Sequence, residues 1–264
     1  MIWPSEDLWQ ALVAWQSGLT VEVLTQIDST NTELMRRARV GHTDPVLLVA
    51  EAQTAGRGRL GRPWHGQTGD ALTFSLGLPL MPREWSGLSL AVGLSLAQSL
   101  DPEGALGVGL KWPNDLWVAQ PDMPGGWGKL AGVLIETALT AGAAPDQPRY
   151  CVVGVGINIA PPQEPGLSTA PLGCQQLSPQ ATAPSTLAQV ALPLLKTLLA
   201  FEREGFAPFQ AQFNARDVLH DRSVSLSDGR VGTAQGVDAS GALRVETAQG
   251  SERITSAEVS VRPQ

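Results

Sequence analysis

The sequence is poor in sulfur and in histidine. Its 264 residues include two cysteines, Cys151 and Cys174, and three histidines that lie far apart, with no CxxC or HExxH motif. This pattern excludes a disulfide framework and a zinc site built on several cysteines. We therefore expect no structural metal site.

Long apolar runs and a basic amino-terminal segment are missing as well. No uninterrupted apolar stretch reaches the roughly 18 residues of a membrane span, and Lys196 interrupts the best candidate, at 187–201. Glu6 and Asp7 stand where a secretory signal would be basic. We therefore expect no membrane partner and a cytoplasmic location.

Charge is scarce and mainly negative. Charged residues make up 16% of the chain, and 18 Lys+Arg against 25 Asp+Glu give a net charge of −7. This balance argues against a surface that binds nucleic acid or anionic membrane throughout, although it is compatible with a local basic pocket. The hydrophobic content of 43% supplies a sizeable core, and the length fits one large domain or two modest ones.

What the sequence does contain is a series of short apolar runs. The pattern predicts helices at 5–17, 32–38, 88–100, 187–203 and 208–215, and strands at 21–26, 46–50, 72–80, 107–111, 116–119, 129–137 and 150–159. Few helices separate these strands, which favours an α+β fold over a doubly wound one.

The carboxyl-terminal part of the sequence differs in composition and in its pattern of turns. Segment 160–186 holds six prolines and no Lys or Arg, which predicts a surface excursion with little regular structure. After about residue 218, short strands alternate with turns, and Asp228-Gly229 and Ser240-Gly241 are typical of β-hairpins. We therefore expect two domains, 1–217 and 218–264, the second being a small β barrel.

The most unusual stretch reads GRGRLGR over residues 56–62. Its G-x-G-x-x-G spacing does not indicate a dinucleotide fingerprint, because that motif must open a helix and here Pro63 and Gly66 follow. Glycines let a backbone approach an anion closely, and arginines bind phosphate or carboxylate. The alternatives are a solvated loop and an RNA-binding Arg-Gly segment, which is usually longer and repetitive.

Two clusters place a polar side chain at the end of a strand. In KWPND, at 111–115, Lys111 is either a cation that points into a cleft and holds a carboxylate or α-phosphate, or an ordinary surface lysine. Asp115 would steady that lysine or help to hold Mg²⁺. In GVGIN, at 154–158, Asn158 either binds phosphate or metal or only caps its strand.

Two further clusters are less specific. GKLAG, at 128–132, opens a strand with small residues. These either let a ligand lie against the backbone near Gly132 or provide the small residue that the partner strand of a hairpin requires. Ser29-Thr30-Asn31, at a predicted helix start, offers hydroxyls and an amide, and by itself it is most simply an N-cap.

Taken in this order, the segments resemble bacterial biotin–protein ligases, the biotin–[acetyl-CoA-carboxylase] ligases. The resemblance covers roughly residues 21–262 and rests on STN at 29–31, Gln53, GRGRLGR at 56–62 with Trp64, KWPND, GKLAG and GVGIN. It implies a mixed central sheet with flanking helices of the class II synthetase-like, biotin/lipoate ligase type. The carboxyl-terminal domain would then be an SH3-like β barrel.

The resemblance also implies an activity. Biotin and ATP, with Mg²⁺, would give biotinyl-5′-AMP and pyrophosphate, and biotin would then pass to one lysine of the biotin carboxyl carrier protein of acetyl-CoA carboxylase. The implied biotin contacts are Ser29, Thr30, Asn31, Gln53, Arg57, Gly58, Arg59, Lys111 and Gly132. The implied ATP or adenylate contacts are Arg57, Arg59, Arg62, Trp64, Lys111 and Asn158. Among them Lys111, Arg59 and Arg62 would be the catalytic cations, and Asp115 and Asn158 are the candidates for contacting Mg²⁺.

The chain also departs from the family pattern. Leu60 stands where the loop frequently has an arginine, and only about 20 residues precede the first expected strand. Since a folded DNA-binding module needs about 50 residues, we expect no repressor role and no DNA partner, while the resemblance permits a homodimer. The alternative functions are a lipoate or octanoate ligase or transferase, and a non-enzymatic biotin-binding regulator.

Overall fold

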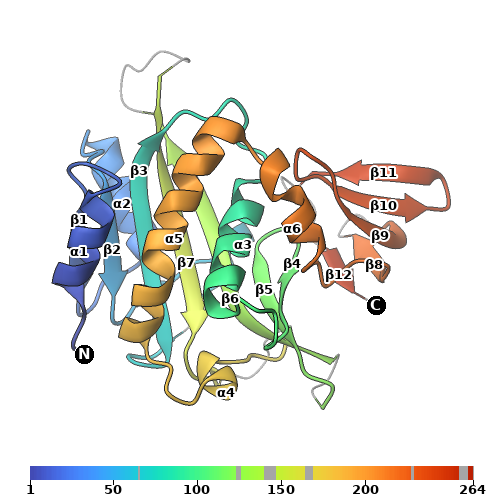
Figure 1. Cartoon of the computed structure of the whole chain (residues 1–264), viewed down its shortest axis with the longest axis horizontal. Coiled ribbons are helices and arrows are strands. Elements are labelled where there is room, and N and C mark those ends of the chain that lie inside the picture. Colours follow the sequence, from blue (N-terminus) through green and yellow to red (C-terminus); the bar gives the residue numbers. More distant parts are fainter. Residues whose placement is uncertain are drawn as a thin grey trace.

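The computed structural model describes residues 1–64, 66–122, 126–139, 147–163, 169–226, 229–255 and 261–263. Its strands form two sheets, one of seven strands and one of five. Figure 1 shows the larger sheet in the body of the molecule, with helices packed against it, and the smaller sheet at the carboxyl-terminal end.

The larger sheet has the strand order β1-β2-β3-β7-β6-β5-β4. β1 runs parallel to β2, and every other neighbouring pair is antiparallel. The predicted α+β fold with a mixed sheet is therefore confirmed, and each predicted strand of this sheet is present to within two residues at either end. The bounds are β1 Thr20–Leu24, β2 Val46–Ala50, β3 Ala71–Leu80, β4 Val108–Lys111, β5 Asp115–Ala119, β6 Trp127–Ala138 and β7 Arg149–Asn158.

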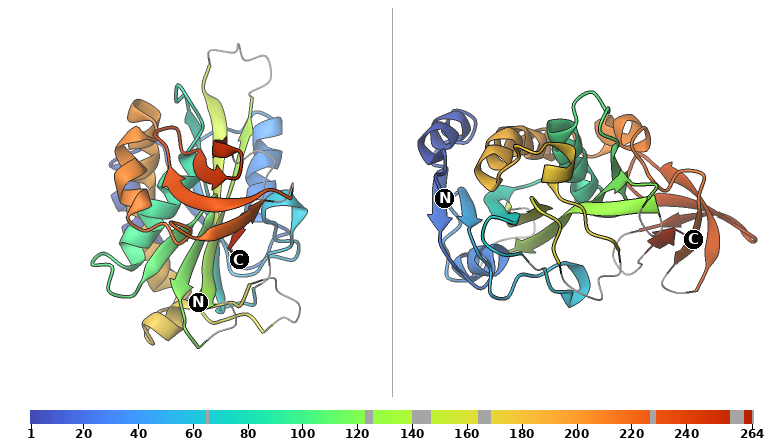
Figure 2. Two further views of the ribbon diagram at one scale, coloured as in Figure 1. Left: turned by 90° about the vertical axis from the view of Figure 1, so that its right-hand side faces the viewer. Right: turned by 90° about the horizontal axis from the view of Figure 1, so that it is seen from below.

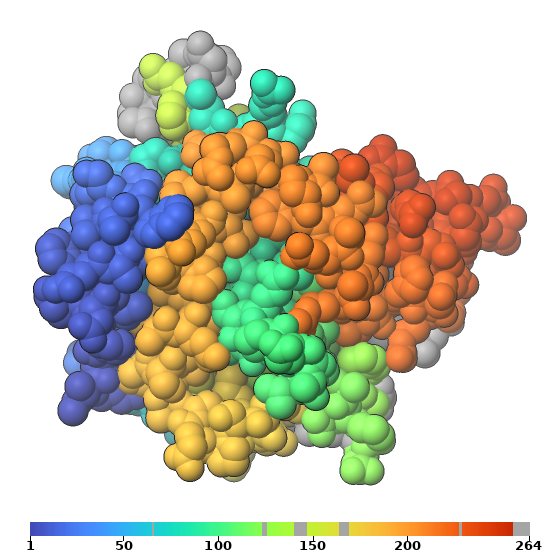
Figure 3. Space-filling view, viewed as in Figure 1, coloured from blue at the N-terminus to red at the C-terminus, as the bar shows by residue number. Residues whose placement is uncertain are grey.

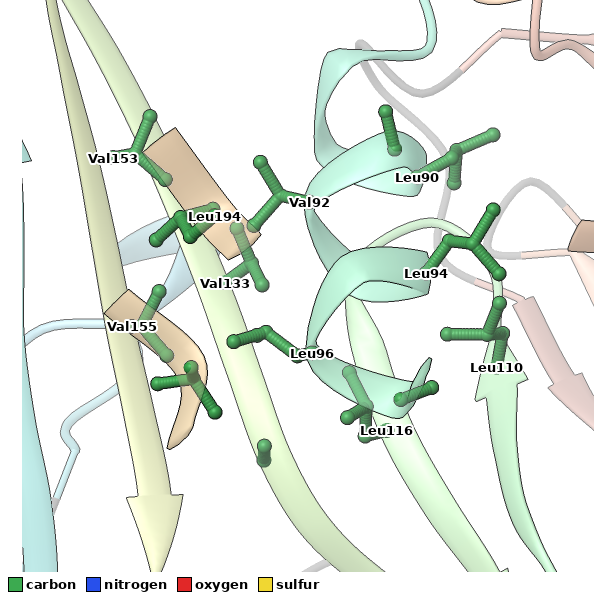
Figure 4. Close-up of a cluster of buried hydrophobic side chains, with 14 of the residues drawn as sticks. Leu90, Val92, Leu94, Leu96, Leu110, Leu116, Val133, Val153, Val155 and Leu194 are labelled. Atoms are coloured by element: carbon green, nitrogen blue, oxygen red, sulfur yellow. The ribbon is translucent and has the colours of Figure 1, made fainter. Parts of the chain in front are cut away.

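Three helices cover one face of this sheet: α1 (Ser5–Val13), α3 (Leu88–Leu100) and α5 (Ala183–Glu204). Figure 3 shows them side by side as a continuous layer. Leucines and valines of α3 and α5 meet Val133, Val153 and Val155 of the sheet (Figure 4). α3 is apolar on nearly all sides, which is why it lies in the middle of this layer.

Of the helices that the structure describes, α5 alone is long and apolar enough to cross a membrane. Its apolar side packs inside the protein, because Leu187, Leu194 and Leu198 are fully buried in the core. Thr182 and Ser185 form a capping box, which explains why the helix begins four residues before its predicted start.

The opposite face of the sheet carries α2 (Thr30–Arg39). The right panel of Figure 2 shows α2 and the segment that follows β2 on this side, away from α1, α3 and α5. Ser29 caps α2, since its hydroxyl accepts a hydrogen bond from Thr32 N at 3.4 Å, so the N-cap predicted within Ser29-Thr30-Asn31 falls on Ser29. Leu34 and Ala38 of α2 pack against Leu48 and Val152.

The smaller sheet is antiparallel, with the order β11-β10-β9-β8-β12. It has a small core of its own that includes Val224, Val237, Leu243 and Val245. The hairpin predicted at Ser240-Gly241 joins β9 to β10, whereas Asp228 lies outside the described residues. The domain boundary at 217/218 stays a prediction. The bounds are β8 Ser223–Leu226, β9 Val231–Val237, β10 Leu243–Thr247, β11 Gly250–Ile254 and β12 Val261–Pro263.

Direct hydrogen bonds join segments that flank the larger sheet to the β9–β10 hairpin of the smaller sheet. Trp112 is fully buried and its Nε1 donates to Gly241 O at 3.1 Å, while Ser86 Oγ donates to Ser240 O at 2.7 Å. The KWPND turn is therefore in contact with the β9–β10 hairpin. Among the described residues, the remaining short helices are α4 Cys174–Leu177, η1 Arg59–Gly61, η3 Ala207–Phe209 and α6 Gln210–Asn214.

The predicted surface excursion at 160–186 is only partly correct. Residues 164–168 lie outside the described residues, but Leu172 and Cys174 are buried. Lys129 N donates to Ala170 O at 2.8 Å, and Leu172 N donates to Lys129 O at 2.9 Å. The proline count gave no sign of this pairing, which fixes the segment against β6.

Asp217, between α6 and β8, is a buried carboxylate whose hydrogen bonding is incomplete. Its Oδ1 accepts from Leu219 N at 2.9 Å, but Oδ2 is buried without a partner among the described residues. Burial raises the pKa of Asp217 to about 6, and this shift is opposed by the Leu219 hydrogen bond and by His220. The folded protein therefore loses stability as the pH rises through about 6, because it must then bury the charge.

We expect Asp217→Asn to raise the free energy of unfolding at pH 8 by about 1–3 kcal/mol and to change it little at about pH 3, where the carboxyl is protonated in the folded and the unfolded protein. Urea unfolding of both proteins at the two pH values measures this difference. Asp221→Asn is the matched control, because Asp221 is an exposed neighbour. A wild-type protein as stable as the Asp217→Asn variant at pH 8 contradicts the expectation.

Candidate active site

A row of residues crosses the larger sheet on the face that carries α2. The strand pairing joins Thr73 to Gly156, Gly156 to Gly132, Gly132 to Asp115, and Asp115 to Lys111. Residues paired in this way point to the same face of a sheet. Two adjacent glycines, Gly132 and Gly156, therefore leave a strip of bare backbone, here called the glycine patch, on which a flat ligand can lie.

Trp64 covers the glycine patch. A Cβ atom at Gly156 would overlap the Trp64 ring, and one at Gly132 would lie 3.5 Å from its Cζ3 atom. The loop before Trp64 is a narrow hairpin, in which Gly58 N donates to Arg62 O at 2.7 Å and Trp64 N donates to Gly56 O at 2.9 Å. The Arg-Gly loop therefore brings an aromatic ring against the patch, as well as positive charge.

A buried polar cluster lies on the α2 side of the patch. Ser75 Oγ is within hydrogen-bond distance of Thr30 Oγ1, at 2.7 Å, and of Asn31 Oδ1, at 2.6 Å. Gln53 Oε1 accepts from the backbone N of Thr30 at 2.7 Å and from its hydroxyl at 3.2 Å. Three of the residues predicted to contact biotin are therefore held together, and they offer hydroxyl, amide and carbonyl groups to a neutral polar ligand.

Asn31 is fixed from both sides. Its Nδ2 donates to Leu134 O at 3.2 Å and to Glu136 Oε2 at 3.0 Å. Gly154 leaves the space that its carbonyl oxygen occupies, because a Cβ there would overlap Asn31 Oδ1. Glu136 also pairs with Arg57, whose Nη2 lies 3.2 Å from Oε2. The first arginine of the loop is therefore tied to this cluster.

Four cations gather at the other side of the patch, around Asp115; they form the cation cluster of Arg59, Arg62, Lys111 and Lys129. Lys129 Nζ lies 2.8 Å from Asp115 Oδ1. Arg59 Nη1 donates to Asn114 Oδ1 at 3.4 Å. Burial lowers the pKa of Arg59, and the charge of Arg62 adds to this effect while Asp115 opposes it.

Lys111 is the most strongly perturbed member of the cation cluster. Burial lowers its pKa to about 8, Asp115 opposes the shift, and the three other cations add to it. Among the described residues, no carboxylate lies within salt-bridge distance of its Nζ. A group of cations that exceeds its carboxylates, beside a bare sheet surface, is suited to an anionic ligand.

The structure gives several predicted site residues a local role. The Ser29 hydroxyl caps α2, and the backbone N of Gly58 closes the loop hairpin. Asn158 is buried, and its Nδ2 donates to Lys129 O at 3.1 Å and to Leu172 O at 3.2 Å. Its amide nitrogen therefore fixes neighbouring backbone. The described residues contain no cluster of three or more His, Cys, Asp or Glu side chains that would hold a metal ion.

Three residues of the site were not identified from the sequence. Lys129 reaches the glycine patch, 3.5 Å from a Cβ position on Gly132, and its Nζ lies 5.9 Å from the Trp64 ring centroid. Ser75 and Glu136 complete the polar cluster. Ser75 and Thr73 alternate on the site face of β3, and this period of two was the available signal.

Comparison with known proteins places these features in one family. Residues 23–158 match the Biotin/lipoate A/B protein ligase family, and residues 224–262 match the Biotin protein ligase C terminal domain. The chain is 35% identical to the bifunctional ligase/repressor BirA of Escherichia coli over 237 residues, which is 87% of this chain and 70% of that protein. It is 30% identical to the biotin–[acetyl-CoA-carboxylase] ligase of Paracoccus denitrificans, over 90% of this chain and 98% of that protein.

A solved structure agrees with this match. The biotin protein ligase from Aquifex aeolicus in complex with biotin and ATP superposes with a TM-score of 0.74 at 26% identity, and the match covers 94% of this chain and 100% of that one. The agreement includes both sheets, since it extends over nearly the whole chain.

Proposed function

The chain belongs to the Biotin/lipoate A/B protein ligase family, and from this premise we propose how its site carries out biotin–protein ligation. The enzyme uses ATP to activate biotin and then attaches biotin to a protein. The observation that carries the assignment of roles is the row across the sheet, in which the glycine patch lies between the polar cluster and the cation cluster.

The shape of biotin fits this row. Its ureido group both donates and accepts hydrogen bonds, which suits Thr30, Asn31 and Gln53. Its fused rings would lie on the glycine patch once Trp64 has moved from the bare backbone to cover the ligand. Its carboxylate would then point to Lys111 and Lys129. Lys129 is added to the residues predicted from the sequence because its ammonium group lies closest to the patch.

The same arrangement supports the first chemical step. A biotin carboxylate oxygen forms a bond to the α-phosphorus of ATP, and the bond from that phosphorus to the leaving pyrophosphate breaks. Both reactants are anions, so Lys111, Lys129, Arg59 and Arg62 would bring them together and stabilise the charge that develops on the phosphoryl oxygens. Closure of Trp64 over the site would keep water from the adenylate.

The second step and the remaining partners are proposed from the relatives and from the composition of the chain. The acceptor would be a lysine of the biotin carboxyl carrier protein of acetyl-CoA carboxylase, as the name of the Paracoccus denitrificans relative suggests. Mg²⁺ would arrive with the phosphates of ATP, and Asp115 is already paired with Lys129.

A cytoplasmic location is supported by the two free cysteines, Cys151 and Cys174. The net charge of −7 supports the absence of a DNA partner. A homodimer stays a prediction.

ATP–pyrophosphate exchange with purified protein and Mg²⁺ tests the activation step. We expect exchange that depends on biotin and that is absent with lipoate, with octanoate and without any acid. Exchange with lipoate or octanoate alone would instead assign the chain to the lipoate side of the family. Tight binding of biotin without exchange would favour a regulator and remove the roles given to Lys111 and Arg59.

A further inference from the structure

A stack of two indole rings between two cations leads away from Lys111. Lys111 Nζ lies 5.5 Å from the centroid of the Trp117 ring. The Trp117 and Trp127 centroids are 6.5 Å apart, with the rings tilted by 41°. The guanidinium of Arg222 lies 5.0 Å from the Trp127 centroid. These distances are within the ranges of cation–π and aromatic contacts. The four residues are here called the Trp117 stack.

The Trp117 stack joins the two sheets of the molecule. Trp117 is on β5 and Trp127 is the first residue of β6, both in the larger sheet. Arg222 immediately precedes β8, and its carbonyl accepts a hydrogen bond from Ala234 N of β9 at 3.0 Å. A change in the position of the smaller sheet would therefore be transmitted through two rings to Lys111.

The position of Trp117 carries an energetic penalty. Trp117 is 6% exposed, and its indole Nε1 is buried with no hydrogen-bond partner among the described residues. A leucine or phenylalanine at this position would not bury an unpaired N–H group, which is unfavourable, but each is smaller than tryptophan and would leave part of the space empty. The indole offsets this penalty through its volume and through its ring face, which lies within cation–π distance of Lys111 and within aromatic-contact distance of Trp127.

We propose that Trp117, held by Trp127 and Arg222, is a positioning residue that aims the ammonium group of Lys111 at the reacting phosphate. This inference rests on the proposed function, because it requires Lys111 to act in the activation step. Lys111 needs such support, since no carboxylate of the described residues is close enough to fix its Nζ. The ring holds the cation without neutralising it, so its charge stays available to an anionic substrate.

A double-mutant cycle tests whether Trp117 acts through Lys111. The kcat and KM of ATP–pyrophosphate exchange are measured for the wild-type protein, Trp117→Leu, Trp117→Phe, Lys111→Met and the double variant Trp117→Leu/Lys111→Met. We expect Trp117→Leu to lower kcat about 2- to 30-fold with little change in the KM for biotin. Trp117→Phe, which keeps a ring face, should recover most of the rate. In the Lys111→Met background, Trp117→Leu should lower the rate less than about twofold.

Arg222→Gln provides a second variant that leaves the core intact, because Arg222 is exposed. We expect it to lower kcat in the same direction but less, at an unchanged Tm, and to have no effect in the Lys111→Met background. Arg244→Gln, in the same small sheet, is the control and should leave the rate unchanged, since the Arg244 guanidinium donates to Gln235 O at 2.7 Å.

Two results would overturn the proposal. Losses that multiply in the double variants would mean that Trp117 and Arg222 do not act through Lys111. A Trp117→Phe variant as slow as Trp117→Leu would mean that only the volume of the side chain matters. The proposed function would fail differently, because the wild-type protein would then show no exchange with biotin.

Discussion

Replacement of Lys111 by methionine is expected to lower kcat for ATP–pyrophosphate exchange with biotin by about 10²–10³-fold, the loss typical of a removed oxyanion-stabilising donor. Lys129→Met should cause a comparable loss. Asp115 then loses the partner that lies 2.8 Å from its Oδ1, and its freed carboxylate competes with substrate for Lys111. Exchange measured at saturating biotin and ATP gives both values.

The lost rate should not come from unfolding. Burial lowers the pKa of Lys111 to about 8, so near pH 7 the folded protein buries a charge that the unfolded chain exposes to water. The free energy of unfolding therefore falls as the pH decreases through about 8, and Lys111→Met removes this penalty. We expect the Tm of the variant at pH 7 to equal or exceed that of the wild-type protein.

The same pKa gives the reaction an alkaline limit. In the substrate-free enzyme, Lys111 loses its proton as the pH rises through about 8. Because the lysine must be charged to act, the activity of the enzyme should fall over the same pH range. Lys196→Met is the matched control, because Lys196 is exposed and stacks over Trp15 with its Nζ 4.4 Å from the ring centroid. Near-normal turnover in Lys111→Met would show that the lysine has no role in the chemistry.

The features that could be predicted from the sequence are those that a short stretch of residues specifies by itself. An N-cap within Ser29-Thr30-Asn31 was predicted, and the apolar strand Val46–Ala50 and the helix Leu88–Leu100 were predicted with correct bounds, because each carries its own signal. The concentration of arginines at 56–62 in an acidic chain predicts an anion site, with a solvated loop as the alternative that the sequence leaves open.

Lys129 and Glu136 could not be predicted in the same way. The pairing of β5 with β6 shifts register between Leu116 and Trp117, so alternation along the sequence does not give the side chains that share a face. Glu136 joins the site only because Asn31 and Arg57, each more than 75 positions away along the chain, reach it. Contacts of this kind depend on tertiary packing and leave no local pattern.

A substitution in the glycine patch is expected to have the second large effect, on the KM for biotin. Gly156→Val should raise the KM for biotin by at least about 10- to 100-fold, because its methyl groups would occupy the bare backbone and also overlap the Trp64 ring. Val155→Ala is the control on the same strand. Val155 packs against the helical layer (Figure 4), so its truncation should lower stability and leave the KM for biotin unchanged.

Gly132→Ala separates the ligand effect from packing. A Cβ at Gly132 would lie 3.5 Å from Asp115 Oδ1, Lys129 Nζ and Trp64 Cζ3, which is ordinary van der Waals contact. The ligand-free protein should therefore accept the methyl group without loss of Tm, whereas a ring lying flat on the patch would be lifted from the sheet. Calorimetric titration with biotin should show weaker binding at an unchanged Tm. Wild-type affinity in Gly132→Ala would mean that biotin does not lie on this patch, and the roles of Trp64 and Lys129 would have to be reassigned with it.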